Sequence, residues 1–349
     1  MRWASVLAPI LACGLAACSG AAAGPAAPGA APGTPSPAPS STNAPASPAP
    51  SGQPLQHVSI GAPGPSLSYL PAYLASKLGY FQEEGLDPEF VQITGPAAIA
   101  AVINGELDFT TLLSAIGANA LQGGPTRIVQ FHSVKLQHVV SAPPTITAIS
   151  QLAGKRIGVD SLGTLTAFET RKLADKFQIP DLAIVAAGNE LERIAAMQSG
   201  AIDASIESIP ANLVAEREGF PTLLRIGTVL DIPQAGFGTS QDTLRDKAPL
   251  VSGSLRAAAR ALPVIANQRD TVVQVIAEFV SLEPGDAQKA YDQVVDTYSP
   301  NGLPTDAQLA AYADLLEETA GAPPGAQPDQ MVDFTIARRV AADLGLPSQ

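Results

Sequence analysis

Residues 99–109 read IAAVINGELDF, and residues 194–204 read IAAMQSGAIDA. Each copy has Ile-Ala-Ala, three further residues, a Gly, two residues and an Asp. The apolar spacing before the Gly predicts a helix, the Gly suits a left-handed C-cap, and the Asp leads into a run typical of a strand. The interval between the copies is too long for a solenoid repeat. The repeated phrase therefore predicts two similar α/β units.

The pattern around each copy follows one order of strands and helices. Around the first copy it predicts strands at 57–62, 88–93, 107–111 and 127–131, with helices at 69–78, 97–104 and 114–121. Around the second it predicts strands at 156–159, 182–186, 202–206 and 223–226, with helices at 166–177, 190–199 and 210–218. Thr166 and Glu169 have the spacing of a capping box that opens the helix at 166. Short strand–helix connections favour parallel strands with right-handed crossovers.

The rest of the chain, from about residue 240, is predicted to be mostly helical. The helical spacing falls at 250–267, 271–279, 286–298, 305–319 and 329–344. Such a tail is expected to pack back onto the first α/β unit.

The start of the chain predicts export and anchoring. Residues 1–17 contain one basic residue, Arg2, followed by a short apolar stretch that ends in Leu-Ala-Ala. This pattern is typical of a signal peptide. The site before Cys18 resembles a bacterial lipobox, and we expect Cys18 to be lipidated. The alternative is an ordinary cleaved signal with an incidental Cys. Residues 18–54 then comprise the lipidated Cys and an uncharged Ala/Pro-rich tether that is expected to be disordered.

Charge and cysteine content exclude several classes of partner and site. The 349 residues contain 20 Lys and Arg against 32 Asp and Glu, a formal net charge of −12. Such an acidic, aromatic-poor chain argues against nucleic acid and anionic lipid as partners. Beyond Cys13 and Cys18 there is no cysteine, so a domain that follows the anchor has neither a disulfide nor a thiol nucleophile. His57, His132 and His138 lack metal-ligand spacing, and we expect no metal and no cofactor.

Four stretches resemble one protein family in their order and spacing. They are SYLPAYLASKLGYFQEEGLDPEFVQITG (68–95), NGELDFTTLLS (104–114), LAGKRIGVDSLG (152–163) and SGAIDASIESIPANLVAEREGF (199–220). The set is similar to ABC-transporter substrate-binding proteins of the nitrate/sulfonate/taurine type, a group that includes thiamine-pyrimidine binding and synthesis proteins. The resemblance covers about residues 57–340. It is specific for the family and poorly specific for the ligand.

The resemblance implies an α/β, two-lobed type II periplasmic-binding-protein fold, each lobe a mainly parallel sheet flanked by helices, with a hinge between the lobes. It places lobe one at 55–140 plus 236–349 and lobe two at 141–235. It also implies a small-molecule ligand in the cleft and, as partners, an ABC permease with its ATPase. We expect a monomer in the cell envelope, extracytoplasmic, that touches the membrane only through its lipid anchor.

The candidate ligand residues follow from the rule that open α/β sheets bind ligands outside the carboxyl ends of their strands. In lobe two, the turn at 161–166 would offer backbone N–H groups, hydroxyls and a helix dipole to a carboxylate, sulfonate or phosphate. The alternative for this turn is plain helix capping, and Asn189 has the same alternative. The candidates in lobe two are Ser161, Gly163, Thr164, Thr166, Asn189, Glu207 and Ser208.

Lobe one repeats this logic with hydroxyls at its own strand ends. Its candidates are Ser66, Ser68, Tyr69, Thr94, Gly95, Thr111 and Ser114. Tyr69 would add a flat face for the apolar part of an organic ligand, and its alternative is a core-packing tyrosine.

Glu207 bears on the charge of the ligand. A carboxylate after this strand would pair with a ligand ammonium or accept from a hydroxyl, and would repel a simple anion in a cleft of low dielectric. The alternative is a side chain turned outward into water. Glu207 therefore disfavours nitrate or a bare sulfonate. We expect a small organic ligand, anionic or zwitterionic, with an aromatic part as one option.

Three functions remain open at this point. The first is the solute-binding component of an ABC importer, and the second is a binding protein that docks to a membrane receptor and signals. The third is an envelope enzyme on the same fold, which we do not expect because Gly-x-Ser-x-Gly, Walker and dinucleotide motifs are absent. Asp108 and Asp203 lie at strand starts, so we interpret them as turn-stabilising rather than catalytic.

Overall fold

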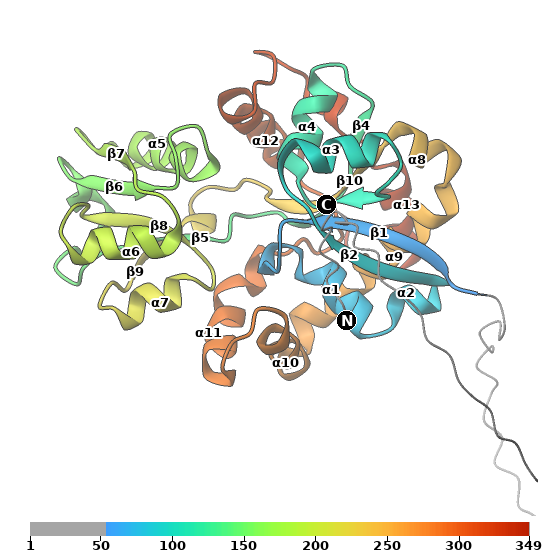
Figure 1. The fold of residues 1–349 in the computed structure, drawn as a ribbon, viewed down its shortest axis with the longest axis horizontal. Helices are drawn as coiled ribbons and strands as arrows, with labels where there is room; N and C mark the ends of the chain where they lie inside the picture. The colour runs from blue at the N-terminus through green and yellow to red at the C-terminus, as the bar shows by residue number, and fades with distance from the viewer. Residues whose placement is uncertain (1–53, 349) are drawn as a thin grey trace, which may run out of the picture. The chain divides into compact units, whose positions relative to one another are not determined.

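The computed structural model describes residues 54–348, and the predicted signal peptide, Cys18 and nearly all of the predicted tether lie outside this range. Two five-stranded sheets form the frame of the described chain (Figure 1). The first sheet has the order β2-β1-β3-β10-β4, and the second has the order β7-β6-β8-β5-β9. Helices flank both sheets, which confirms the predicted α/β class.

The strands keep the predicted positions with small shifts at their ends. Those of the first sheet are β1 (Gln56–Ala62), β2 (Leu86–Gln92), β3 (Phe109–Thr110), β4 (Thr126–Ser133) and β10 (Ala235–Ser240). Those of the second are β5 (His138–Ser141), β6 (Arg156–Val159), β7 (Ala183–Ala186), β8 (Ala204–Ser208) and β9 (Thr222–Arg225). As predicted, β1 is parallel to β2 and β3, and β6 is parallel to β7 and β8.

Strands β5 and β10 were not predicted. Each is the first strand after the chain crosses from one sheet to the other. Each runs antiparallel to its two neighbours in the sheet. β10 reads AGFGTS, and a Cβ added to Gly236 would lie 2.0 Å from the carbonyl oxygen of Gln130. Only glycine fits this close approach, and glycine weakens the strand pattern in the sequence.

Three helices follow strands of the second sheet, and the others belong to segments before β5 or after β10. The three are α5 (Leu165–Phe177), α6 (Glu190–Gln198) and α7 (Asn212–Arg217). The earlier segments form α1 (Leu70–Lys77), α2 (Tyr80–Glu83), α3 (Gly95–Ile103) and α4 (Leu113–Leu121). The later ones form α8 (Gln241–Asp246), α9 (Ala248–Asn267), α10 (Arg269–Phe279), α11 (Pro284–Val294), α12 (Asp306–Thr319) and α13 (Thr335–Asp343). Short 3₁₀ turns are η1 (Leu67–Tyr69), η2 (Ile149–Leu152), η3 (Ile226–Thr228), η4 (Val295–Thr297) and η5 (Pro328–Met331).

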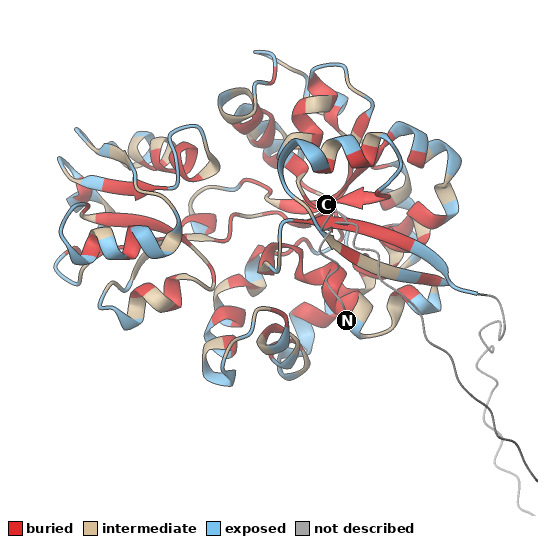
Figure 2. Ribbon diagram, viewed as in Figure 1, coloured by how far each residue is buried: buried red, intermediate tan, exposed pale blue. Residues whose placement is uncertain are grey.

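The C-terminal helices pack back onto the first sheet's helices, as predicted. α9 packs against α1, and α13 packs against α9. The inner face of α9 is rich in buried alanines, which lets neighbouring backbones approach closely. Figure 2 shows buried residues concentrated on the strands and on the helix faces turned toward them. α12 is different, because it contacts both α4 and α5.

The repeated phrase has the same structure in both copies. It forms the end of α3 and of α6, and Gly105 (φ 74°) and Gly200 (φ 71°) end these helices in the left-handed region. The Asp108 carboxylate then accepts from the backbone N–H of Ser59 at 3.0 Å, and that of Asp203 accepts from Arg156 N–H at 2.9 Å. Each aspartate thus joins neighbouring parallel strands near the edge where those strands start, which supports the structural interpretation of both.

The predicted capping box at Thr166 and Glu169 is wrong. α5 begins one residue earlier, at Leu165, with Thr164 at the N-cap, so Thr166 lies within the first turn. The Glu169 carboxylate is fully buried and contacts the imidazole of His138 instead of a backbone N–H. Spacing alone could not reveal this partner, which comes from a different strand.

Candidate ligand site

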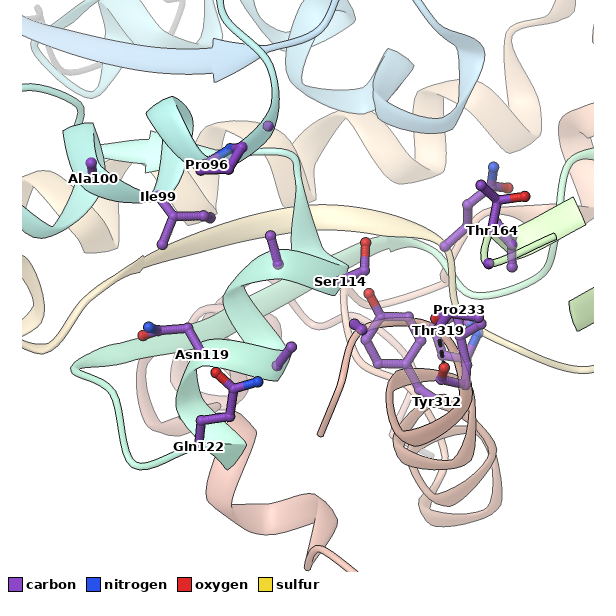
Figure 3. Close-up of a pocket in the computed structure, with 18 of the residues that line it drawn as sticks. Pro96, Ile99, Ala100, Ser114, Asn119, Gln122, Thr164, Pro233, Tyr312 and Thr319 are labelled. Carbon is purple, nitrogen blue, oxygen red and sulfur yellow. Dashed lines mark hydrogen bonds between the residues drawn. The ribbon is translucent and has the colours of Figure 1, made fainter. Parts of the chain in front are cut away.

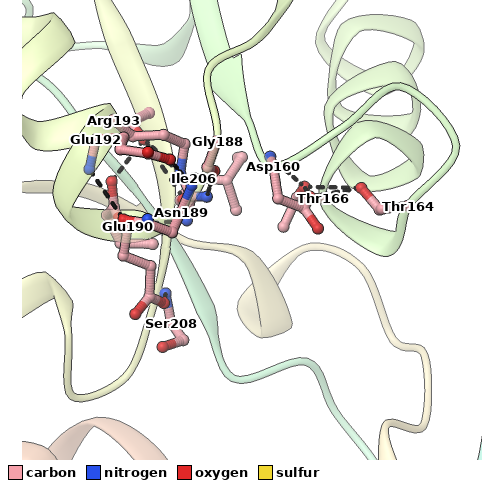
Figure 4. Close-up of polar contacts among 12 residues, drawn as sticks. Asp160, Thr164, Thr166, Gly188, Asn189, Glu190, Glu192, Arg193, Ile206 and Ser208 are labelled. Carbon is pink, nitrogen blue, oxygen red and sulfur yellow. Dashed lines mark hydrogen bonds and ion pairs between the residues drawn. The ribbon is translucent and has the colours of Figure 1, made fainter. Parts of the chain in front are cut away.

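A pocket of about 390 Å³ lies where the parallel strands of the second sheet end. Asp160 directly follows β6, Asn189 follows β7 after a short turn, and Ser208 is the last residue of β8. We call this the polar pocket. Its lining consists of His138, Asp160, Leu165, Thr166, Asn189, Glu190, Arg193 and Ser208. Figure 4 shows most of these side chains.

Two hydroxyls of the turn at 161–166, those of Thr164 and Thr166, contact Asp160. Thr164 and Thr166 both donate to the Asp160 carboxylate, and Thr164 also lies 2.7 Å from the carbonyl oxygen of Ser161 (Figure 4). Burial raises the pKa of Asp160, but these hydroxyl bonds outweigh burial, and the pKa lies below its ordinary value. The two hydroxyls predicted to face an anion therefore stabilise a carboxylate.

Asn189 and Glu190 hold the start of α6. The Asn189 side chain accepts a hydrogen bond from the backbone N–H of Glu192. The Glu192 carboxylate accepts one from the backbone N–H of Asn189, so the two residues form a capping box. Glu190 accepts from the backbone N–H of Ser208 at 3.0 Å, which ties the helix to the end of β8 (Figure 4).

Arg193 and Glu207 form a buried ion pair behind the polar pocket. Arg193 Nη2 lies 3.3 Å from Glu207 Oε2, and Arg193 also donates to the carbonyl oxygen of Gly188 at 2.6 Å. Ser205 donates to the other Glu207 oxygen at 2.6 Å. Burial raises the pKa of Glu207 to about 7 despite these partners. The alternative in which Glu207 turns outward into water is wrong, because its side chain is fully buried.

His138 and Glu169 form a second buried pair beside the same pocket. Nδ1 of His138 lies 2.7 Å from Oε1 of Glu169, and His138 pairs across the strands with Ser208. Burial lowers the pKa of His138, but the Glu169 carboxylate outweighs burial and the net shift is upward. Glu169 therefore favours the imidazolium at the wall of the pocket.

A second pocket, of about 720 Å³, adjoins the first and carries no Asp, Glu, Lys, Arg or His. We call it the uncharged pocket. α3 and α4 supply one side, through Ile99, Ile103 and Ala115 among others. The other side comes from α12, residues 163–165 and the connection at 233–234. Figure 3 shows Ile99 and Ser114 on one side and Thr164, Tyr312 and Thr319 on the other. Leu165 lines both pockets, so they are neighbours.

The predicted site residues divide among the two pockets and their surroundings. The uncharged pocket includes Gly95, Ser114, Gly163 and Thr164, and the polar pocket includes Thr166, Asn189 and Ser208. Neither pocket is lined by Ser66, Ser68, Tyr69, Thr94, Thr111, Ser161 or Glu207.

The candidates from η1 have structural roles in the described chain. The Ser66 side chain accepts from the backbone N–H of Ser68. Tyr69 is 4% exposed and packs edge-on against Phe279, and burial raises its pKa. The hydroxyl of Thr111, another predicted contact, is buried without a hydrogen-bond partner in the described chain.

Sequence reasoning missed four ionisable residues of the polar pocket: His138, Asp160, Glu190 and Arg193. Asp160 and Glu190 each adjoin a residue that was predicted, so the strand-end rule could have included them. His138 opens a strand that was not predicted, and Arg193 lies one turn inside α6. Only the packing of the second sheet reveals these two.

Residues 54–348 offer neither a membrane-spanning helix nor a metal site. Within that range, no helix is both long and apolar enough to span a bilayer. In the same range, His, Cys, Asp and Glu form no group of three that could hold a metal ion.

Comparisons with known proteins agree on the fold. Residues 67–271 match the family model described as NMT1/THI5 like, which is more than half of the chain. No curated protein matches the sequence. Among solved structures, a sulfonate-binding protein SsuA from Methylobacillus flagellatus has a TM-score of 0.69 at 15% identity, covering 84% of this chain and 96% of its own.

Two other solved structures have related folds and belong to proteins that are named for different functions. The nitrate-binding protein NrtA from Synechocystis has a TM-score of 0.62 at 13% identity, covering 83% of this chain and 89% of its own. The desulfurization enzyme DSZB has a TM-score of 0.58 at 16% identity, covering 83% and 99%. At these identities the likeness shows the fold alone. With the matched family model, it establishes that this chain belongs to the NMT1/THI5-like family and has the fold of the periplasmic binding proteins.

Proposed function

We propose that this protein is the solute-binding component of an ABC importer, which captures a small organic molecule and delivers it to a permease with its ATPase. The observation that carries the proposal is the pair of adjoining pockets at the strand ends of the second sheet. The uncharged pocket takes its walls from α3, α4 and α12 and from residues 163–165 that follow β6. A ligand there would contact segments from both halves of the repeated pattern.

The proposed mechanism is closure of lobe one (55–140 plus 236–349) and lobe two (141–235) around the ligand. The chain passes between the sheets at residues 134–137 and 226–234, and these connections would serve as the hinge. A ligand that contacts both lobes favours the closed state by its extra affinity for that state. Of the predicted contacts, we propose those that line the two pockets: Gly95, Ser114, Gly163, Thr164, Thr166, Asn189 and Ser208.

Ion pairs between the proposed lobes suit a movable arrangement. Lys172 lies 2.6 Å from Glu318, and Arg217 lies 2.6 Å from Asp286, so α5 and α7 supply cations to carboxylates of α12 and α11. Exposed pairs of this kind contribute at most about 1 kcal/mol each. Such weak pairs would favour the approach of lobe one and lobe two without preventing their separation.

We propose binding without turnover. His138 and Ser208 are cross-strand neighbours, but no hydrogen bond joins the Ser208 hydroxyl to the imidazole in the described chain. A nucleophile is normally within hydrogen-bond reach of its base. The importer function also includes the signal peptide at 1–17, the lipid anchor at Cys18 and the tether that follows.

Native mass spectrometry of freshly purified protein tests the function. We expect a retained small molecule in the wild type and its loss in Ser114→Trp, because Ser114 is exposed in the uncharged pocket at the start of α4. Lys176→Trp is the matched control, since Lys176 is exposed on α5 and lines neither pocket. Absence of a retained molecule, or equal occupancy in all three proteins, would contradict the proposal.

A further inference from the structure

The charges of the polar pocket identify a chemical class of ligand. Four of its lining residues are ionisable: the cations Arg193 and His138 and the carboxylates Asp160 and Glu190. Their partners decide which charges remain available to a ligand, because a charge with a close counter-ion attracts a second ion less strongly.

Both cations of the pocket already have buried counter-ions. Arg193, 3% exposed, pairs with Glu207 at 3.3 Å and is held by Ser205 and by the carbonyl oxygen of Gly188. His138 pairs with Glu169 at 2.7 Å. An incoming sulfonate or nitrate would have to compete with carboxylates that are fixed in place and fully buried.

Within residues 54–348, neither lining carboxylate forms an ion pair, although the charge of Glu190 also acts on His138. Asp160 is held by the hydroxyls of Thr164 and Thr166, and Glu190 by the backbone N–H of Ser208. These neutral donors position the carboxylates without cancelling their charge. Glu169 also has a second oxygen, Oε2, that is buried and unpartnered in the described chain. Around the polar pocket, the four carboxylates of Asp160, Glu190, Glu169 and Glu207 outnumber the two cations, Arg193 and His138, so the charge balance of this region favours a cation.

The adjoining pocket has the opposite character. Its side chains are mostly apolar, including Ile99, Ile103 and Leu315, and no charged residue lines it. Leu165 lines both the uncharged pocket and the polar pocket. Moving an apolar group from water into such a lining is favourable, so this pocket favours a hydrocarbon or aromatic body.

Combining these observations, we infer that the ligand is an amphiphilic amine whose ammonium group contacts Asp160 and Glu190 and whose uncharged body occupies the pocket between α3, α4 and α12. This inference rests on the proposed function and deepens it. It distinguishes this chain from the neighbours named for sulfonate and nitrate. A buried ammonium requires carboxylate or other acceptor partners, and this pocket supplies them.

The test uses matched probes that differ only in the head group. They are hexylamine, hexan-1-ol and hexane-1-sulfonate, then phenethylamine with its alcohol and sulfonate counterparts, and sodium nitrate. Dissociation constants are measured by ligand-observed proton NMR, and nitrate, which has no proton, is measured by its competition with hexylamine. In each series, we expect the amine to bind tightest and the sulfonate weakest. A sulfonate that binds as tightly as its amine, or amines that do not bind at millimolar concentration, would overturn the inference.

Two isosteric variants link the binding to the carboxylates. Asp160→Asn and Glu190→Gln remove charge but keep an oxygen that accepts the present hydrogen bonds, so both should fold. We expect each to weaken amine binding about tenfold or more, because bonds to charged groups are the strong ones, and to change alcohol binding little. Asp175→Asn is the control, since Asp175 is exposed on α5 and lines neither pocket. Equal amine affinity in all four proteins would also overturn the inference.

The two proposals fail in different ways. If a sulfonate or nitrate binds tightly and competes with the molecule retained in native mass spectrometry, the solute-binding function stands and the amine class is wrong. If the protein retains no molecule, the proposed function itself is contradicted.

Discussion

The imidazole of His138 and the carboxylate of Glu169 are joined by a 2.7 Å contact beside the polar pocket. His138 is the first residue of β5, and Glu169, 31 residues later, is the fifth residue of α5. The Glu169 side chain is fully buried, so its charge acts on His138 in an environment of low dielectric. This contact explains both a failed prediction, the capping box, and the upward shift in the His138 pKa.

Replacing Glu169 by Gln tests this electrostatic link. Without the carboxylate, burial should dominate, and the pKa of His138 should fall below its wild-type value. The measurement is an NMR titration of the His138 imidazole. Glu89→Gln is the control, because Glu89 contacts His57 rather than His138. An unchanged His138 titration in Glu169→Gln would show that the contact has no electrostatic effect.

The His138–Glu169 pair should also make the free energy of unfolding depend on pH. Because the folded pKa of His138 lies above 6.5, its ordinary value, the pair's contribution is fully present below pH 6.5. The contribution is lost as pH rises through the folded pKa. Urea unfolding of the wild type should therefore show falling stability above pH 6.5, and Glu169→Gln should lack this part of the fall. Identical pH dependence in the two proteins would refute the linkage.

Arg193→Met should destabilise the protein because it leaves Glu207 buried without its cation. Breaking a buried ion pair in this way costs about 3–5 kcal/mol. The loss should be largest above pH 7, where Glu207 is ionised, and smaller below it, where the carboxyl can be protonated. Urea unfolding measures both. The double variant Arg193→Met, Glu207→Leu should recover most of the stability, and a double variant as unstable as the single one would argue against the pair.

Amine binding should weaken as pH falls through about 7, the pKa of Glu207. Protonation of Glu207 removes the counter-charge of Arg193, so the polar pocket becomes more positive and repels an ammonium. Glu190, Arg193 and the His138–Glu169 pair also act on this region, and His138 itself titrates. Glu207→Gln isolates the effect, because it should remove the change in hexylamine affinity near pH 7. If the change persists in this variant, another group causes it.

Two glycines should respond differently to alanine. A Cβ at Gly236 would meet the Gln130 carbonyl oxygen at 2.0 Å, whereas a Cβ at Gly163 would meet nothing within 4 Å. We expect Gly236→Ala to cost about 1–3 kcal/mol or more, as overpacking does. Gly163→Ala should stay within about 0.5 kcal/mol of the wild type. Thermal unfolding compares the two, and a tolerated Gly236→Ala would contradict the close approach of β10 to β4.

The sequence predicted much of the fold because many helix ends and strand starts depend on residues that are close together in the chain. The Gly stops at 105 and 200 and the Asp entries at 108 and 203 recur with the same spacing, and both pairs have the same structure. β5 and β10 escaped prediction because they are short or glycine-rich and take their place in a sheet only through distant partners.

The candidate site was only partly predictable for a related reason. Strand ends supplied Thr166, Asn189 and Ser208, which share the polar pocket. The charge balance there depends on Glu169 and Arg193, which lie inside helices and contact other elements. The uncharged pocket depends on α12, which comes from a distant part of the chain. No local pattern carries such pairings.

The most direct test of the account is a crystal structure of the protein with the molecule that it retains on purification. We expect an organic molecule whose uncharged body lies between α3, α4 and α12 and whose nitrogen is within hydrogen-bond distance of Asp160 or Glu190. A molecule outside both pockets, or an anionic group bound in the polar pocket, would contradict it.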